Sequence, residues 1–163
     1  MLFYSALFLL AFVYANLLEW AIHKYLFHGA GKNKKSSFAG HWHIHHKLCR
    51  KNGNADKTYK DFPAHPSVKQ EVVSLLALVF LHTPILFVSP FFFGCLTYFT
   101  ARYFYIHRRC HVDVEWGKRN FPWHYDHHMG KNQDANWGVT NPLWDYILTT
   151  RIKYLRQHSE VPL

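Results

Sequence analysis

Cysteine and acidic residues are scarce in this chain of 163 residues, which has three cysteines and ten carboxylates against 19 lysines and arginines. The cysteines are odd in number and far apart, which excludes a small disulfide-linked scaffold and is typical of a reducing compartment. Ten carboxylates leave few donors for a carboxylate-bridged metal site or for a glycosidase site built on two acids. The length predicts one domain over residues 1–163, with no room for a second catalytic module.

Apolar residues are abundant but unevenly distributed. Hydrophobic residues make up 49% of the chain and aromatic residues 18%, a composition that excludes a disordered protein. The mean hydropathy of −0.20 conceals a segregation, because long apolar runs alternate with segments rich in Lys, Arg and His. The averaged value therefore does not exclude a membrane protein.

Three apolar stretches predict membrane-spanning helices at about residues 2–22, 70–88 and 90–107. The first continues past Glu19 for the ~20 residues that one span needs. No basic residue precedes it and no clear cleavage site follows, which favours a span over a signal peptide. Its length favours a span over the buried helix of a soluble protein, which stays the alternative. The other two are short for a bilayer ~30 Å thick and meet at Ser89 and Pro90, which predicts a helical hairpin that turns there.

The basic residues predict the orientation. Nothing basic precedes the first stretch, whereas four lysines follow it by residue 35. The positive-inside rule then places the N-terminus outside, and residues 24–68 and everything from Arg108 onward inside. The predicted fold is all-α: an integral-membrane protein with one N-terminal span, a hairpin and a cytoplasmic helical cap rich in histidine. The net charge of +9 is explained by this topology or by contact with anionic lipid, and no nucleic-acid partner is expected because no such motif accompanies the charge.

Histidine is unusually frequent, with 14 residues gathered mostly in four clusters. These are HKYLFH at residues 23–28, HWHIHH at 41–46, HRRCH at 107–111 and HYDHH at 124–128. Residues three or four apart share one face of a helix. By this rule three sets share a face: His107 with His111, His124 with His127 and His128, and His41 with His45, His46 being one step round.

The first cluster has a different spacing. His23 and His28 are five residues apart, which is about 140° around a regular helix. Gly29 follows at once and is a natural helix terminator. The pair therefore predicts either a frayed helix end at His28 or a π-type bulge that realigns the two rings.

Neutral imidazole is a common ligand of iron and zinc, and facing helices that each carry such a set can hold metal between them. Ten clustered histidines are more than one ion can use, which predicts two metal ions. The candidate ligands are His23, His28, His41, His45, His46, His107, His111, His124, His127 and His128.

The remaining histidines have other predicted roles. His43 breaks the period of its cluster, so we expect it either to support the ligands from behind or to face solvent. His65 and His158 are isolated and are expected to be structural or solvated. His82 lies inside the hairpin, where a hydrogen bond between packed helices is its favoured role over a functional one.

At this point the sequence resembles the fatty acid hydroxylase/sterol desaturase superfamily of membrane oxygenases with histidine-ligated metals. The resemblance rests on the four clusters together and on NWGVTNPLWDYILTT at residues 136–150, which is similar to the terminal signature of that superfamily. The small size and the HKYLFHG box also resemble the related β-carotene hydroxylases, whereas Pro142 to Asp145 favours the hydroxylase/desaturase branch.

The resemblance implies a non-haem centre of two Fe ions, which Zn can replace in a purified sample, with O₂ as co-substrate and two external electrons. It also implies lipid substrates and a multi-pass location in the bacterial inner membrane or the endoplasmic reticulum. The chain is shorter than most members of the superfamily and carries no fused haem domain. We therefore expect a separate electron donor of the ferredoxin, rubredoxin or cytochrome b5 type.

The resulting functional hypothesis is hydroxylation or desaturation of an unactivated C–H bond of a lipid. A carotenoid-ring hydroxylase with the same mechanism is an alternative, and a membrane metal-handling protein is the non-enzymatic one. Asp126 is the best candidate for orienting a ligand histidine, ahead of Asp113, Glu115 and Asp145. Leu26, Phe27 and residues 98–105 are candidate walls of a substrate tunnel, with ordinary core packing as their alternative role.

Overall fold

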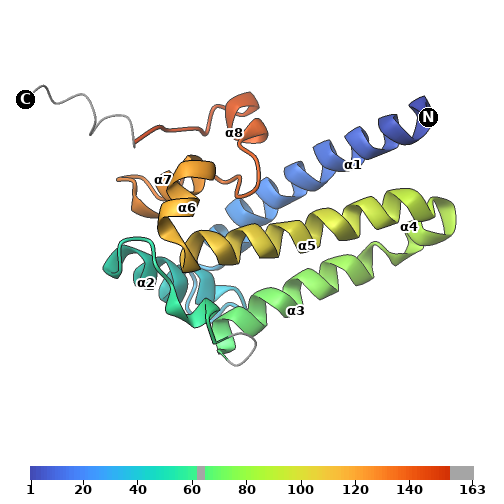
Figure 1. The fold of residues 1–163 in the computed structure, drawn as a ribbon. Coiled ribbons are helices and arrows are strands. Elements are labelled where there is room, and N and C mark those ends of the chain that lie inside the picture. The colour runs from blue at the N-terminus through green and yellow to red at the C-terminus, as the bar shows by residue number, and fades with distance from the viewer. Residues whose placement is uncertain (62–64, 155–163) are drawn as a thin grey trace, which may run out of the picture.

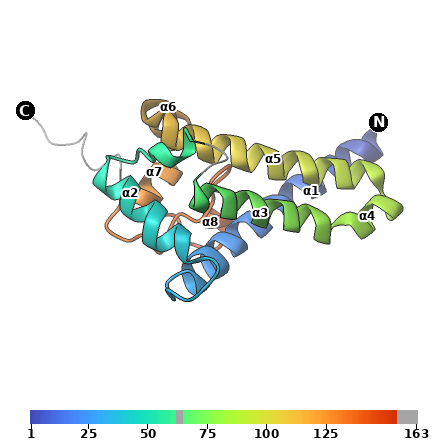
Figure 2. The same ribbon diagram turned by 90° about the horizontal axis from the view of Figure 1, so that it is seen from below.

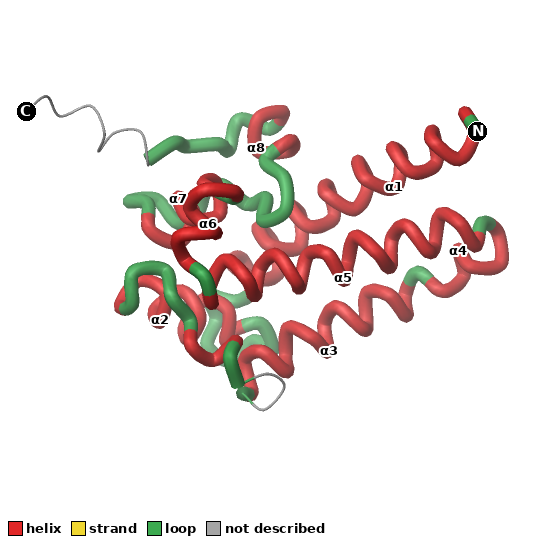
Figure 3. Tube along the Cα trace, in the orientation of Figure 1, coloured by secondary structure: helices red, strands yellow, loops and turns green. Residues whose placement is uncertain are grey.

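The computed structural model describes residues 1–61 and 65–154, and every regular element among them is a helix (Figures 1 and 3). The elements in chain order are α1 (Leu2–Ala21), the π-helix η1 (Ile22–Ala30), the π-helix η2 (His41–His45), α2 (His46–Lys51), the 3₁₀-helix η3 (Lys57–Tyr59), α3 (Pro66–Leu81), α4 (Thr83–Val88), α5 (Pro90–Val112), α6 (Val114–Asn120), α7 (Pro122–Met129) and α8 (Leu143–Ile147). The all-α prediction is confirmed for these residues.

Three long helical segments lie side by side, as both views in Figures 1 and 2 show. Helix α5 packs against α1 around Ala11, Leu96 and Phe99, and it runs antiparallel to α3. The chain reverses at Ser89, whose hydroxyl accepts the N–H of Phe92 and so caps α5. A proline at the first turn supports this start, because its missing N–H has no partner there in any case. The hairpin predicted to turn at Ser89 and Pro90 is confirmed.

Two helical segments are long and apolar enough to cross a membrane, Leu2–Ala30 and Pro66–Val88. Large apolar side chains on them, such as Leu9, Phe80 and Phe87, are exposed, as lipid contact would require. The third predicted span forms α5, which does not meet the same apolarity criterion. The physical reason is the composition of α5, which carries Arg102 between its apolar residues and arginines and histidines in its last turns. Its insertion into a bilayer stays a prediction.

Most of the short elements gather at one end of the three long segments (Figure 1). Helices α2, α6, α7 and α8 and the two π-helices all lie there, whereas α4 and the N-terminus mark the opposite end. Each of the four histidine clusters belongs to this end, because η1, η2 with α2, the last turns of α5, and α7 carry them and all lie there. The predicted helical cap therefore exists, and its cytoplasmic location stays a prediction.

Gly29 was expected to terminate the first helical segment, but the segment does not end there. It continues as the π-helix η1, and Gly31 is the C-cap of that element. Of the two alternatives predicted from the five-residue spacing of His23 and His28, the frayed helix end is wrong and the π-type distortion is confirmed. Gly31 is required for space and not for its dihedral angles: a Cβ at this position would overlap the carbonyl oxygen of Phe27 and lie 2.9 Å from that of Phe38.

Replacing Gly31 with alanine is expected to lower the free energy of unfolding by about 1–3 kcal/mol, because the main chain must move to admit the methyl group. Gly94→Ala is the matched control, since a Cβ in that part of α5 meets no heavy atom within 4 Å. Thermal unfolding of both variants in detergent measures the difference. Equal unfolding temperatures for Gly31→Ala and the wild type would show that the main chain around Gly31 has room for a methyl group.

Candidate metal centre

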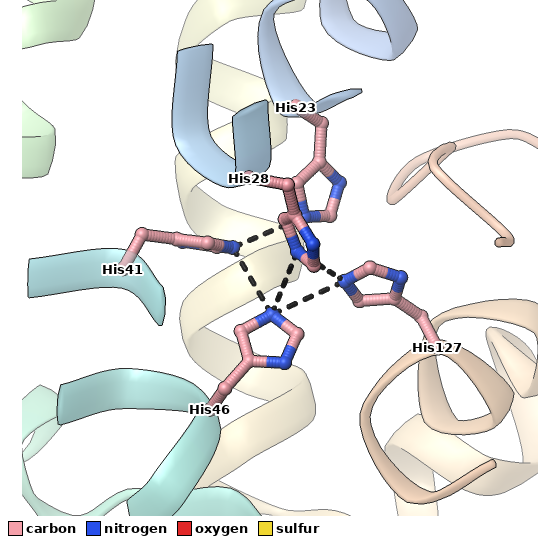
Figure 4. A group of neighbouring side chains, drawn as sticks. All are labelled: His23, His28, His41, His46 and His127. Atoms are coloured by element: carbon pink, nitrogen blue, oxygen red, sulfur yellow. Dashed lines mark hydrogen bonds between the residues drawn. The ribbon is translucent and has the colours of Figure 1, made fainter. Parts of the chain in front are cut away.

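Five of the predicted ligands form a first group of rings, drawn in Figure 4. Two come from η1, two from the segment where η2 joins α2, and one from α7. They are His23, His28, His41, His46 and His127, and one ligand nitrogen from each lies within 4.8 Å of the others. All are buried except the half-buried His41. Segments that are far apart in the sequence thus meet at one point.

A second group of four buried histidines lies beside the first. It consists of His45, His107, His111 and His128, and their ligand atoms also lie within 4.8 Å of one another. The tenth predicted ligand, His124, adjoins this group, because its Nε2 is 3.0 Å from Nε2 of His111. The structure therefore brings all ten candidates together in two neighbouring sets.

The π-helices explain which histidine rings belong to the first group. Rings five residues apart align when the hydrogen bonds run from i to i+5, so His23 joins His28 and His41 joins His46. The structure thus places His41 with His46, whereas its four-residue spacing had paired it with His45. His107 and His111 share one group as expected.

Helix α7 divides its histidines between the two groups instead of presenting them on one face. His127 belongs to the first group and His128 to the second. Successive residues of a helix differ by about 100°, so a helix that lies between two sites can serve both. The sequence spacing had predicted that His127 and His128 share one helix face and therefore one site. That prediction did not allow for a helix that contacts two sites.

In the first group, acceptors behind the rings fix the protonation of three imidazoles. The carbonyl oxygens of Trp137 and Ala135 lie 2.7 Å from Nδ1 of His23 and of His127 respectively. A carboxylate oxygen of Asp134 lies 3.3 Å from Nδ1 of His28. A carbonyl or carboxylate only accepts, so each Nδ1 carries the proton and donates it. The Nε2 atom of each neutral ring then presents a lone pair to the centre.

The second group is held in the same way. Nδ1 of His45 donates to Asp56 over 2.8 Å and Nδ1 of His107 to Glu71 over 2.7 Å. Nδ1 of His111 donates to the carbonyl of Asn54 over 2.9 Å. These partners orient each ring and increase its strength as a ligand, the usual arrangement behind metal-bound histidine.

The inward-facing nitrogens consequently oppose one another without protons between them. Nε2 of His28 lies 3.1 Å from Nε2 of His127, one of the contacts dashed in Figure 4, although both rings are already protonated on Nδ1. Two lone pairs at this distance repel unless a cation lies between them. Ligands bound at ~2.1 Å and about 90° apart would be about 3.0 Å from each other, which matches the observed separation.

Burial supports the same conclusion. Removal from water holds the pKa of His127, and likewise of His128, well below the ordinary value, so these rings stay neutral and able to bind metal. Both ring nitrogens of His128 and Nε2 of His107 are buried without a hydrogen-bond partner among the described residues. Buried polar atoms normally have one, and a metal ion held by these groups would supply it. The donor set, all imidazole nitrogen, fits iron or zinc.

A family comparison assigns the chain. The sequence model of the fatty acid hydroxylase family matches residues 8–150, a range that includes all ten histidines of the two groups. The chain belongs to the fatty acid hydroxylase family. No curated protein and no solved structure matches it. The resemblance seen in the sequence is confirmed at this level, and membership implies an iron-dependent oxidoreductase associated with membranes.

Three carboxylates that contact histidines of the two groups, Asp56, Glu71 and Asp134, were not singled out from the sequence. Glu71 had a usable signal, because an isolated carboxylate in an apolar helix such as α3 is expensive unless it is paired. Asp56 and Asp134 lie in loops, where their spacing from the clusters carries no information.

The carboxylates proposed from the sequence have other partners. Asp126, the best candidate, is buried and forms an ion pair with Arg151 over 2.7 Å. Asp113 caps α6, and the exposed Glu115 pairs with Lys118. Asp145 supports a histidine indirectly. It accepts the backbone N–H of Trp137, whose carbonyl oxygen in turn accepts from Nδ1 of His23.

The histidines outside the two groups also have partners. His43 contacts the carbonyl of Lys32 over 3.0 Å and does not belong to either group. His65 caps α3 through Ser67. Nε2 of His82 lies 2.9 Å from the hydroxyl of Tyr14, which confirms the predicted bond between helices. His158 lies outside the described residues.

Two cavities lie near the histidine groups. An apolar cleft of about 720 Å³, part of it open to the exterior, lies among α1, α3 and α5, and its walls include Phe27, Phe99 and Tyr103. These three residues were among the predicted tunnel walls, whereas Leu26, Tyr98 and Tyr105 do not line it. A second cavity of about 370 Å³ borders His41 and His45 directly.

Asp56→Asn is expected to weaken Fe²⁺ binding by about 10- to 100-fold, the usual effect of losing a partner behind a metal-bound histidine. The amide can still accept from Thr58 but presents an N–H to Nδ1 of His45, which needs an acceptor. Asp61→Asn, at an exposed position five residues away, is the control. Titration of the metal-free protein with Fe²⁺ measures both variants, and equal affinities would mean that Asp56 does not support the ligand.

Proposed function

We propose that this chain is a membrane-bound non-haem di-iron oxygenase that hydroxylates or desaturates an unactivated C–H bond of a lipid. The observation that carries the proposal is the pair of adjacent histidine groups whose unprotonated Nε2 atoms face one another. His23, His28, His41, His46 and His127 would hold one iron, and His45, His107, His111, His128 and His124 the other.

The chemistry requires such a centre, because acid–base groups alone cannot remove hydrogen from an unactivated carbon. Bound iron would supply the activation of O₂ that this chain's own residues lack. In hydroxylation, one oxygen atom enters the C–H bond and the other leaves as water, with two electrons and two protons from a donor. In desaturation, two hydrogens leave the substrate and both oxygen atoms leave as water with the same external electrons and protons.

The protein's own contribution is positioning. Backbone carbonyls and carboxylates hold the Nδ1 protons on the outer side of the rings, so that the inner nitrogens keep their lone pairs. Burial of the rings excludes water from the centre. The apolar cleft among the long helices offers a route for a lipid chain from the bilayer, with Phe27 at its inner end.

Location and electron supply belong to the same proposal. Lys24 and the lysines that follow it favour a cytoplasmic centre in a multi-pass protein of the bacterial inner membrane or endoplasmic reticulum. The electrons would come from a ferredoxin, rubredoxin or cytochrome b5 type of protein. The basic side chains of Lys47 and Lys51 on α2 and of Lys57 on η3 are exposed and suit an acidic donor of this kind.

The decisive experiment combines purified, iron-loaded protein with membrane lipid extract, O₂ and a reduced donor, using the three donor types in separate reactions. We expect O₂ uptake that depends on both lipid and reductant, together with lipid products heavier by one oxygen or lighter by two hydrogens. Metal binding without any lipid-dependent oxidation would instead favour a metal-handling protein. Incubation without O₂ is the control, and a carotenoid product would identify the ring-hydroxylase alternative.

A further inference from the structure

A thiol lies behind the second histidine group. Cys49 is buried on α2, four residues after His45, and residues with this spacing share one face of a helix. Its Sγ lies 3.7 Å from Nδ1 of His45 and 3.4 Å from Nδ1 of His111, which are the outer nitrogens of the two rings. The proposed di-iron centre uses the inner nitrogens, so it leaves this thiol without a role.

Asp56 completes a set of three different donors. Its Oδ2 lies 2.8 Å from Nδ1 of His45, while its Oδ1 accepts from the backbone N–H and the hydroxyl of Thr58, which fixes the carboxylate. The ligand atoms of His45, Cys49 and Asp56 all lie within 4.8 Å of one another, and the three residues are buried. Three protein donors with a fourth position open to water are a known arrangement for zinc.

The chemistry of this set suits zinc better than iron. A thiolate favours zinc, whereas the two histidine groups offer only imidazole, which also suits iron. The charges of one thiolate and one carboxylate together balance a divalent cation, as a buried ion requires. Zinc bonds of ~2.3 Å to sulfur and ~2.0 Å to nitrogen at a tetrahedral angle place these two atoms about 3.5 Å apart, close to the 3.7 Å between Cys49 and His45.

We propose that Cys49, Asp56 and Nδ1 of His45 form a third metal site, for zinc or a similar soft divalent cation, and that its occupation displaces iron from the second histidine group. The site itself is independent of the proposed function, whereas the effect on iron rests on it. A neutral imidazole has one proton and one lone pair, so His45 binds metal through one nitrogen at a time. Zinc on Nδ1 leaves the ring proton on Nε2, and the proton of the Cys49 thiol is released to solvent as the Zn–S bond forms.

The consequence is inhibition of the centre by a second kind of metal. The cavity of about 370 Å³ that borders His45 gives an ion access to this ring. Zinc in the third site leaves the second group with one donor fewer, because His45 no longer serves it. None of the five histidines of the first group belongs to the third site, so that group should keep its iron.

Cobalt(II) is the probe for the third site, because charge transfer from a thiolate to this ion gives an absorption band in the near ultraviolet that all-imidazole sites lack. We expect metal-free wild-type protein titrated with Co²⁺ to show this band and Cys49→Ala to lack it. Cys95→Ala, the same change at a buried cysteine of the apolar core around Ala11, is the matched control and should keep the band. A wild-type protein without the band at saturating Co²⁺, or an undiminished band in Cys49→Ala, would overturn the site.

Displacement of iron tests the competition between the two sites. Protein loaded with iron in both groups is incubated with increasing Zn²⁺, and the retained iron is measured by metal analysis. Half-release of iron from one group should need at least about tenfold more Zn²⁺ in Cys49→Ala than in the wild type, the effect of removing one group from a metal site. Cys95→Ala should respond as the wild type does. If Cys49→Ala loses iron at the same Zn²⁺ concentration as the wild type, the two sites do not compete.

The outcomes also separate this proposal from the proposed function. Neither the cobalt band nor the retained iron depends on lipid oxidation. A protein that binds iron but oxidises no lipid would contradict the proposed function, and the third site would still be decided by the two metal measurements. Conversely, a protein that oxidises lipid and shows no cobalt–thiolate band would keep the proposed function and exclude the third site.

Discussion

Replacing His127 with alanine should remove bound iron and abolish lipid oxidation together. Nε2 of His127 lies 3.1 Å from that of His28 and 3.2 Å from that of His46, so it is central to the first group. The remaining rings would be left with an open side and a void of imidazole size. We expect the iron content to fall from about two per chain to one or fewer, and activity to fall to that of the metal-free protein. His45→Ala and His111→Ala should have the same effect through the second group.

The matched control for this result is His43→Ala. His43 belongs to the same dense cluster as His41 and His45, yet its ring contacts the carbonyl of Lys32 outside both groups. Iron analysis of the purified variants and the lipid oxidation assay should separate it from the ligands. Full iron content and activity in His127→Ala would remove this residue from the ligand set and place the centre elsewhere.

The second large effect is expected at Asp145. Its buried carboxylate accepts the backbone N–H groups of Trp137 and Gly138 over 2.8 and 2.7 Å, and the indole N–H of Trp20 on α1 over 3.2 Å. In Asp145→Asn an NH₂ group replaces one of the two acceptor oxygens, so at least one buried donor loses its hydrogen-bond partner. We expect the free energy of unfolding to fall by about 3 kcal/mol, and thus the thermal midpoint by about 6–12 °C.

Because the carbonyl of Trp137 holds His23, the same substitution should also weaken iron binding in the first group. Glu115→Gln, which alters an exposed pair with Lys118, is the control and should leave both properties unchanged. An Asp145→Asn protein with the wild-type melting temperature would show that the turn of residues 137–145 is held by other contacts.

Features of the fold that depend on local chemistry were predictable from the sequence. The hairpin turn follows from Ser89 and Pro90, which both start a helix, and the π-helix was one of two alternatives for aligning two histidines five residues apart. The bond of His82 across the helices follows from the cost of an unpaired polar group in an apolar segment.

Features that depend on tertiary neighbours were not predictable. Gly29 has the usual chemistry of a helix end, but the chain continues in π-form because the rings of His23 and His28 converge on one site. The separation of His127 from His128 requires knowing that α7 lies between two groups. Asp56 and Asp134 support ligands from loops whose path no periodic pattern determines.

Because main-chain carbonyls hold several of the histidine rings, the centre should respond differently to substitutions than to insertions and deletions. The carbonyls of Asn54, Ala135 and Trp137 hold three of the histidines, and no exchange of one side chain for another deletes a carbonyl. Sequence drift at these positions is therefore compatible with keeping the metals. Inserting or deleting one residue between His128 and Ala135 would displace two of the acceptors at once, so this loop should tolerate substitution far better than any change of length.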